Sequence, residues 1–99
     1  MDKAQFESQL AGKIVLADFS AAWCAPCRAM APVMEELSRA YRGRADIMQI
    51  NIDSEKELAT QLMVHSIPTL ILFDNGQEKK RFVGLQSRSA LEEGLNALL

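Results

Sequence analysis

Residues 17–27 read ADFSAAWCAPC and contain two cysteines, Cys24 and Cys27, which are separated by two residues. The apolar run Ile14–Phe19 enters this stretch with a single acid, Asp18, inside it. A nearly continuous apolar run of this length predicts a strand buried on both faces. The residues after the cysteines have apolar side chains three and four apart, which is the period of a helix. We therefore expect both cysteines where a buried strand passes into the start of a helix.

Segments of helical period alternate with short apolar runs along the whole chain. We expect two helices over 2–11 and 25–42, a short helix that contains Leu58 and Leu62, and a last helix that contains Leu91, Leu95 and Leu98. We expect strands over 14–19, 45–52, 69–73 and 79–83. Asp74-Asn75-Gly76, between the last two strands, is a strong hairpin signal. This order predicts an α/β fold with one mixed four-stranded sheet flanked by helices on both faces. We expect residues 1–99 to form a single domain.

Polar residues and one glycine mark the ends and contacts of these helices. Ser54 and, three residues later, Glu57 form a capping-box pattern for the short helix. The last helix can begin at Ser87 or at Ser89, because either hydroxyl can accept a hydrogen bond from the first turn. Gly94 lies inside that helix and costs about 1 kcal/mol relative to alanine, so we expect it to mark a close contact.

The composition excludes several classes of protein. The chain has 99 residues, 48% hydrophobic and 24% charged, with a formal net charge of −2, which indicates neither disorder nor a basic face for nucleic acid. No apolar run approaches the roughly 20 residues of a membrane-spanning helix. The first ten residues, MDKAQFESQL, lack the apolar core of a secretory signal. We therefore expect a cytoplasmic protein with no nucleic-acid or membrane partner.

The cysteine pair has several possible uses. Positions three apart lie on one face of a helix, so the two sulfur atoms can approach and bond, and the N–H groups at a helix N-terminus favour a thiolate. A structural disulfide closing so short a loop would gain only about 2 kcal/mol. A zinc site needs four ligands, and beyond the two cysteines the chain offers only His65 and carboxylates. A metal cluster shared between two chains would need ligands from the partner. Redox chemistry is therefore the favoured use.

Further motifs surround the cysteines. Asp18 lies in a buried strand, W-C-x-P-C runs from Trp23 to Cys27, and Pro32 follows in the helix. Then come Asn51-Ile52-Asp53, Ile67-Pro68-Thr69, Phe73-Asp74-Asn75-Gly76 and Val83-Gly84. With these motifs the chain resembles the thioredoxin family from about residue 14 to its end. A lone CxxC is a weak signal, whereas this series in this order is very specific, and it implies a thioredoxin fold.

The resemblance implies a dithiol–disulfide oxidoreductase that carries electrons and reduces protein disulfides, with no bound cofactor and no metal. An exposed Cys24 would attack the client disulfide, and Cys27, shielded deeper in the helix, would resolve the mixed disulfide. The implied partners are disulfide-containing client proteins and a flavoprotein thioredoxin reductase that passes on electrons from NADPH.

Asp18 is a further candidate catalytic residue. A carboxyl group within an apolar strand is costly unless it is paired or protonated, so we expect burial to raise its pKa. The alternative is a hydrogen-bonded, inert carboxylate. The resemblance implies a buried acid at this position that accepts the proton of the resolving thiol, here Cys27.

The resemblance also implies a docking surface for an extended client segment. The Ile67–Pro68 peptide bond would be cis and face the cysteines, which would leave the Ile67 backbone free to pair with the client. From the residues alone, Trp23 could equally be a core residue. The implied substrate-binding residues are Trp23, Pro26, Ile67, Pro68, Val83, Gly84 and Leu85.

Four features depart from the family pattern. Ala25 stands where glycine is usual, Ser20 where an aromatic residue is frequent, and Gln49 where a buried lysine commonly neighbours the acid. Without that lysine the pKa of Asp18 should rise further. No strand is expected before the first helix, so the strand over 45–52 would be a sheet edge and a route to a dimer, although we expect a monomer.

These departures keep two alternatives open beside a general reductant of protein disulfides. One is a protein dedicated to a single client, such as a peroxiredoxin or a stress-response enzyme. The other is a module that acts mainly as a binding partner, in which redox cycling is incidental.

Overall fold

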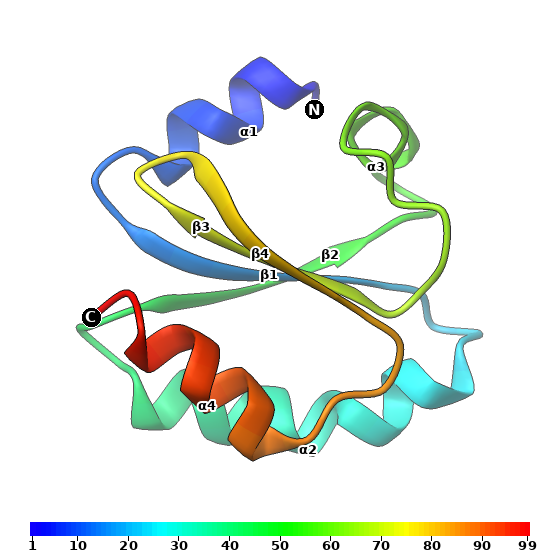
Figure 1. Ribbon diagram of the computed structural model, residues 1–99. Coiled ribbons are helices and arrows are strands. Elements are labelled where there is room, and N and C mark those ends of the chain that lie inside the picture. Colours follow the sequence, from blue (N-terminus) through cyan, green and yellow to red (C-terminus); the bar gives the residue numbers. More distant parts are fainter.

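The computed structural model describes residues 1–99 and contains four helices and four strands (Figure 1). The helices are α1 (Lys3–Leu10), α2 (Ala25–Ala40), α3 (Lys56–Gln61) and α4 (Arg88–Asn96). The strands are β1 (Ile14–Ser20), β2 (Asp46–Asn51), β3 (Thr69–Asp74) and β4 (Gln77–Val83). Every predicted element is present in the predicted order, and the largest differences are at the end of α2 and the start of β4, which lie two residues from their predicted positions.

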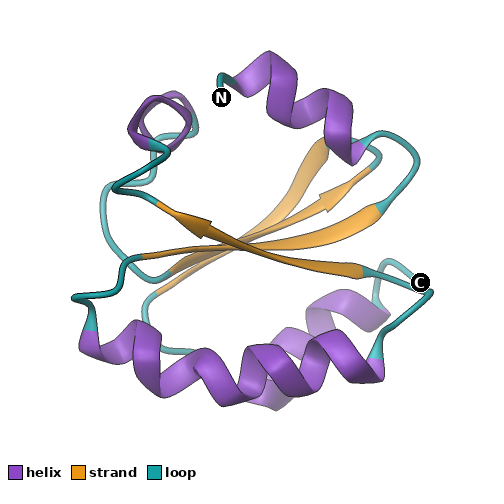
Figure 2. Cartoon of the chain, turned by 180° about the vertical axis from the view of Figure 1, so that it is seen from behind, coloured by secondary structure: helices purple, strands orange, loops and turns teal.

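The four strands form one mixed sheet in the order β2-β1-β3-β4. β1 pairs with β2 in parallel and with β3 antiparallel, and β3 pairs with β4 antiparallel. Helices α1 and α3 cover one face and α2 and α4 cover the other (Figures 1 and 2). The predicted fold class is therefore confirmed. α1 is the first element of the described chain, and β2 lies at the edge of the sheet, as expected.

Apolar clusters fill both sides of the sheet because β1 and β3 are buried on both faces. Leu16, Met30, Leu72 and Leu91 belong to the cluster under α2 and α4. Phe6, Val15, Phe19, Ile71 and Phe73 belong to the cluster under α1 and α3. Successive side chains of a strand point to opposite faces, so Asp18 lies on the same face as Leu16. The sheet thereby turns the one acid of β1 towards the side covered by α2.

The predicted capping box of α3 is wrong. Glu55 occupies the N-cap position and makes no side-chain hydrogen bond to the helix. The Ser54 hydroxyl instead donates to the Asn51 carbonyl over 3.2 Å, so it is engaged in the turn after β2 and is not at the helix end. Of the two candidates for α4, Ser87 is the N-cap, and its Oγ accepts from the Ala90 N–H over 3.2 Å.

Two local predictions are confirmed, one at the turn between β3 and β4 and one inside α4. The turn between β3 and β4 is Asn75-Gly76, and both residues have positive φ, 51° and 83°, as a two-residue hairpin turn requires. Asn75 also accepts from the Gly12 N–H over 2.7 Å. Gly94 marks a close contact, because a Cβ there would lie 2.8 Å from Leu72 Cδ1 and 3.1 Å from Phe82 Cζ. None of the helices is both long and apolar enough to span a membrane.

Candidate active site

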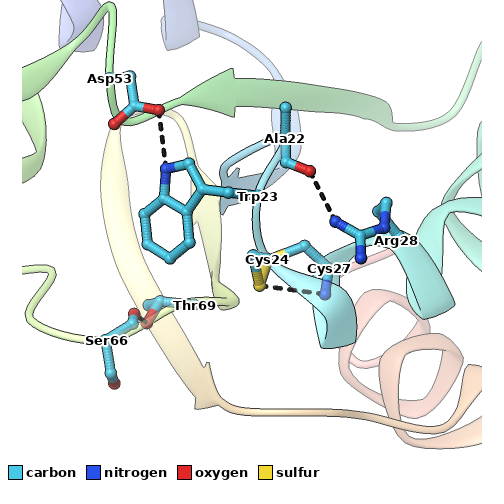
Figure 3. The surroundings of a disulfide bond; sticks show 8 residues. All are labelled: Ala22, Trp23, Cys24, Cys27, Arg28, Asp53, Ser66 and Thr69. Atoms are coloured by element: carbon cyan, nitrogen blue, oxygen red, sulfur yellow. Dashed lines mark hydrogen bonds between the residues drawn. A yellow bond between two sulfur atoms is a disulfide. The ribbon is translucent and has the colours of Figure 1, made fainter.

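The two cysteines form a disulfide at the N-terminus of α2, with their Cα atoms 5.2 Å apart (Figure 3). Cys24 is the N-cap residue, and its Sγ accepts from the Cys27 N–H over 3.2 Å. Pro26 stands in the first turn, where the absence of an N–H costs no helical hydrogen bond. The sequence thus builds a helix start in which a first-turn N–H points at the sulfur of Cys24. A helix N-terminus stabilises negative charge on such an atom.

In the disulfide form the prediction that Cys27 is shielded is confirmed, whereas the prediction that Cys24 is exposed is wrong. Cys24 is 5% exposed and Cys27 is 7% exposed. Both pack with Ala21, and Ile52 and Ile67 cover this small cluster from distant parts of the chain. Exposure therefore does not distinguish the two cysteines, whereas position does, because only Cys24 stands at the N-cap and accepts a backbone N–H.

Asp18 is almost completely buried, with 4% of its surface exposed, and its Oδ1 has no hydrogen-bond partner. The alternative of a carboxylate held by hydrogen bonds therefore does not fit Oδ1. Burial raises the pKa of Asp18 from its ordinary value of 3.8 to about 6. Gln49, the register partner of Asp18 on β2, is exposed and carries no charge. No basic side chain offsets the effect of burial on the pKa.

A cavity of about 380 Å³ lies between the end of β1, β2 and the first turns of α2. Asp18 and Cys27 both line this space, which is compatible with the proton transfer that the resemblance implies. Two of the residues that depart from the family pattern, Ser20 and Gln49, also line it, together with Arg28. Polar side chains thus surround the one buried carboxyl group that lacks a hydrogen-bond donor.

Trp23 lies on the surface, with 65% of its side chain exposed, so the alternative of a core residue is wrong. Its indole N–H donates to the Asp53 carboxylate over 2.9 Å (Figure 3). Val83 and Leu85 are also large exposed apolar residues, at 60% and 63%. The sequence did not reveal the role of Asp53, because the two partners are 30 residues apart.

The segment before β3 has the features expected of a docking edge. The Ile67–Pro68 bond is cis, and Ile67 packs against the cysteine cluster. The Ile67 backbone takes part in no backbone hydrogen bond, whereas the Pro68 carbonyl accepts from the Gly84 N–H over 2.8 Å. The Ile67 N–H and C=O, beside the cysteines, are thereby left without a backbone partner.

Arg28 is a residue of the site that the sequence did not single out. Its Nη1 donates to the Ala22 carbonyl over 2.8 Å (Figure 3). A basic residue six positions after a small one has no recognisable pattern, because the contact depends on how the chain turns into α2. No three side chains of His, Cys, Asp or Glu gather in a way that could hold a metal ion.

The comparisons with known proteins all find similarity to thioredoxins. A sequence model described as Thioredoxin matches residues 1–97. Curated relatives with the name thioredoxin include those of Staphylococcus aureus strains MW2 and N315. Each is 43% identical to this chain over 93 residues, which is 94% of this chain and 89% of the relative. The motifs quoted from the sequence and the geometry of the cysteine pair agree with these similarities.

Proposed function

The chain belongs to the thioredoxin family, and from this premise we propose how its residues share the work of thiol–disulfide exchange. It is a thiol–disulfide oxidoreductase, and proteins of this family use a redox-active disulfide in place of a bound cofactor. The observation that carries the proposal is the position of Cys24 at the N-cap of α2, with the Cys27 N–H donating to its sulfur.

Cys24 is the attacking residue. In the reduced protein its thiolate, stabilised by the helix N-terminus, attacks one sulfur of a client disulfide. The client S–S bond breaks, a Cys24–client disulfide forms, and the departing client sulfur leaves as a thiolate that takes up a proton. One client sulfur is then a free thiol, and the other is bonded to Cys24 in the mixed disulfide.

Cys27 resolves this intermediate, and Asp18 accepts its proton. The Asp18 carboxylate, which has no donor on Oδ1 and lines the same cavity as Cys27, takes the thiol proton. The Cys27 thiolate then attacks Cys24 Sγ, the Cys24–client bond breaks, and the second client thiolate is released. The client has gained two electrons and the chain holds the Cys24–Cys27 disulfide that the structure describes.

An extended segment of the client docks along the surface beside the cysteines. The unpaired Ile67 backbone receives the client as an added strand, and exposed apolar side chains cover its flanks. The residues of this docking surface are Trp23, Pro26, Ile67, Pro68, Val83, Gly84 and Leu85.

The electrons come from NADPH through a flavoprotein thioredoxin reductase, which reduces the Cys24–Cys27 disulfide again. The clients are proteins with accessible disulfides, and the protein works as a monomeric single domain in the cytoplasm. The reductase is needed because each client disulfide that is reduced leaves the cysteine pair oxidised, and the pair must then be reduced once before the next client.

A coupled assay tests the assignment of the two cysteines. NADPH, a thioredoxin reductase, insulin as client and this chain are mixed, and NADPH consumption is followed for the wild type and for Cys24→Ser and Cys27→Ser. We expect both variants to stop turnover and only Cys27→Ser to accumulate a mixed disulfide with the client. NADPH consumption by Cys24→Ser at the wild-type rate, or a mixed disulfide formed through Cys27, would contradict the proposal.

Trapping with Cys27→Ser in a cell extract addresses the breadth of the function. Many trapped proteins indicate a general reductant, and a single trapped protein indicates a dedicated client. If the protein acts mainly as a binding module, partners are retained equally by the wild type, Cys27→Ser and Cys24→Ser.

A further inference from the structure

Arg28 stands in the first turns of α2, next to Cys27 in sequence, yet it forms no ion pair with any carboxylate. Its guanidinium group reaches back along the helix and donates from Nη1 to the Ala22 carbonyl over 2.8 Å (Figure 3). The side chain is exposed, and this is its only hydrogen bond. A hydrogen bond from a charged group is stronger than a neutral one.

The carbonyl that receives this bond belongs to the turn that delivers Cys24. The Cys24 N–H donates to the Ala21 carbonyl over 3.1 Å, which closes a four-residue turn over 21–24. The Cys24 carbonyl in turn accepts from the Arg28 N–H over 3.1 Å. Arg28 therefore holds the turn at two points, through its backbone at Cys24 and through its side chain at Ala22.

The opposite side of the same turn has its own tether, the bond from Trp23 to Asp53. Between the two tethers stands Cys24, whose extended backbone, φ −89° and ψ 111°, aims its sulfur at the Cys27 N–H. A rotation of the turn would move that sulfur away from the donor. The geometry of the attacking sulfur thus depends on contacts made by neighbouring residues.

We propose that Arg28 is a positioning residue: its hydrogen bond to the Ala22 carbonyl clamps the turn onto α2 and keeps the Cys24 thiolate within reach of the Cys27 N–H. This inference rests on the role proposed above for Cys24. The Arg28 side chain makes no hydrogen bond to either cysteine sulfur, and it acts through the backbone of residues 22–24. Loss of the clamp weakens the bond that stabilises the thiolate and raises the pKa of the Cys24 thiol.

Three variants separate the clamp from the positive charge. Arg28→Met removes both. Arg28→Lys keeps the charge but replaces the planar guanidinium by a shorter, flexible ammonium that is not preorganised for the carbonyl. Arg39→Met removes a charge from the far end of the same helix, where Arg39 is exposed and makes no ion pair. Because Arg28 is also exposed, all three variants are expected to fold.

The measurement is the rate at which iodoacetamide alkylates Cys24 in the reduced proteins across a pH series. We expect Arg28→Met to raise the thiol pKa by about half a unit to one unit, which slows alkylation below that pKa by roughly three- to tenfold. Arg28→Lys should give at least half of this shift, and Arg39→Met none. Amide hydrogen exchange at Cys24 should be faster in both Arg28 variants, because the turn has lost its clamp.

Two results would contradict the proposed positioning role of Arg28. An unshifted profile for Arg28→Met excludes any positioning role, and a wild-type profile for Arg28→Lys assigns the effect to charge alone. The role proposed for Cys24 is tested separately, by the turnover of Cys24→Ser in the coupled assay. If Cys24→Ser still supports turnover, the assignment of Cys24 is wrong; if Cys24→Ser is inactive while Arg28→Met is unshifted, only the clamp is wrong.

Discussion

The Trp23 indole N–H donates to the Asp53 carboxylate over 2.9 Å and thereby joins the turn before α2 to the turn after β2. Trp23 is 65% exposed, and an exposed aromatic ring of this size would otherwise be free to rotate over the surface. The Asp53 N–H is itself bonded to the Asn51 side chain over 2.8 Å, so the acceptor is held in place. The ring is therefore fixed beside the cysteines before any client arrives.

Asp53→Ala should weaken the reduction of protein disulfides more than that of small disulfides. Ordering one side chain on binding costs about 0.5–1.5 kcal/mol, so kcat/KM for insulin should fall about two- to tenfold, mainly through KM. A small disulfide does not need the ring and should be reduced at nearly the wild-type rate. Glu35→Ala, which removes an exposed acid from α2, is the control. Equal losses for both substrates would contradict a role of the tether in client docking.

Asp18 should make the protein less stable as the pH rises through the range of its titration. Burial raises the pKa of Asp18 from 3.8 to about 6, so between these values the folded state holds a proton that the unfolded state has lost. Stability then decreases with rising pH, by roughly 3 kcal/mol in total once the pH is well above 6. Below pH 3.8 both states are protonated and the penalty is absent.

Asp18→Asn removes this pH dependence. Chemical unfolding at pH 4 and pH 8 should show a much smaller loss of stability for the variant than for the wild type. Asp46→Asn replaces an exposed carboxylate and should keep the wild-type dependence. A parallel pH dependence for wild type and Asp18→Asn would mean that the pKa of Asp18 is not raised.

Asp18→Asn should also slow the resolution step more than the first attack. The amide cannot accept the Cys27 proton, whereas the Cys24 thiolate forms at the N-cap without it. In rapid-mixing experiments with a disulfide client, the mixed disulfide should therefore accumulate in the variant. If both steps slow equally, Asp18 is not a specific proton acceptor for Cys27.

The sequence predicted most of this structure where local chemistry decides the outcome. β1 and β3 are recognisable because strands buried on both faces need nearly continuous apolar runs, and Asn75-Gly76 fixes the hairpin through two positive φ angles. The start of α3 was missed because the Ser54 hydroxyl has a competing acceptor, the Asn51 carbonyl. Such competition is decided by the path of the turn, which the residue pattern does not contain.

The sequence predicted which residues react at the site, but it did not predict how the surrounding side chains pack against them. The pairing of Cys24 with Cys27 follows from their spacing on a helix. Their equal burial does not, because Ile52 and Ile67 cover them from distant segments. The contacts of Asp53 and Arg28 were missed for the same reason, since each bond joins groups that only the completed turn brings together.

Gly94→Ala should destabilise the protein although alanine favours a helix. The new Cβ would lie 2.8 Å from Leu72 Cδ1 and 3.1 Å from Phe82 Cζ, and both side chains are buried. Overpacking of this kind costs about 1–3 kcal/mol against a gain of about 1 kcal/mol in helix propensity, so the net loss is up to about 2 kcal/mol. Urea unfolding should show the loss, with Ser38→Ala on the exposed face of α2 as control. A stabilised Gly94→Ala would mean that Leu72 and Phe82 can move aside.

Ser87→Ala and Ser89→Ala form a matched pair that tests where α4 begins. Ser87 Oγ accepts from the Ala90 N–H over 3.2 Å and satisfies one of the first-turn donors, so its removal should cost about 1 kcal/mol. Ser89 lies inside the first turn, is exposed and caps nothing, so its removal should change stability by no more than about 0.5 kcal/mol. Arg88, between the two serines, ion-pairs with Glu36 of α2 in both variants. Urea midpoints at unchanged m-value measure the difference directly, and a larger loss for Ser89→Ala would move the helix start by two residues.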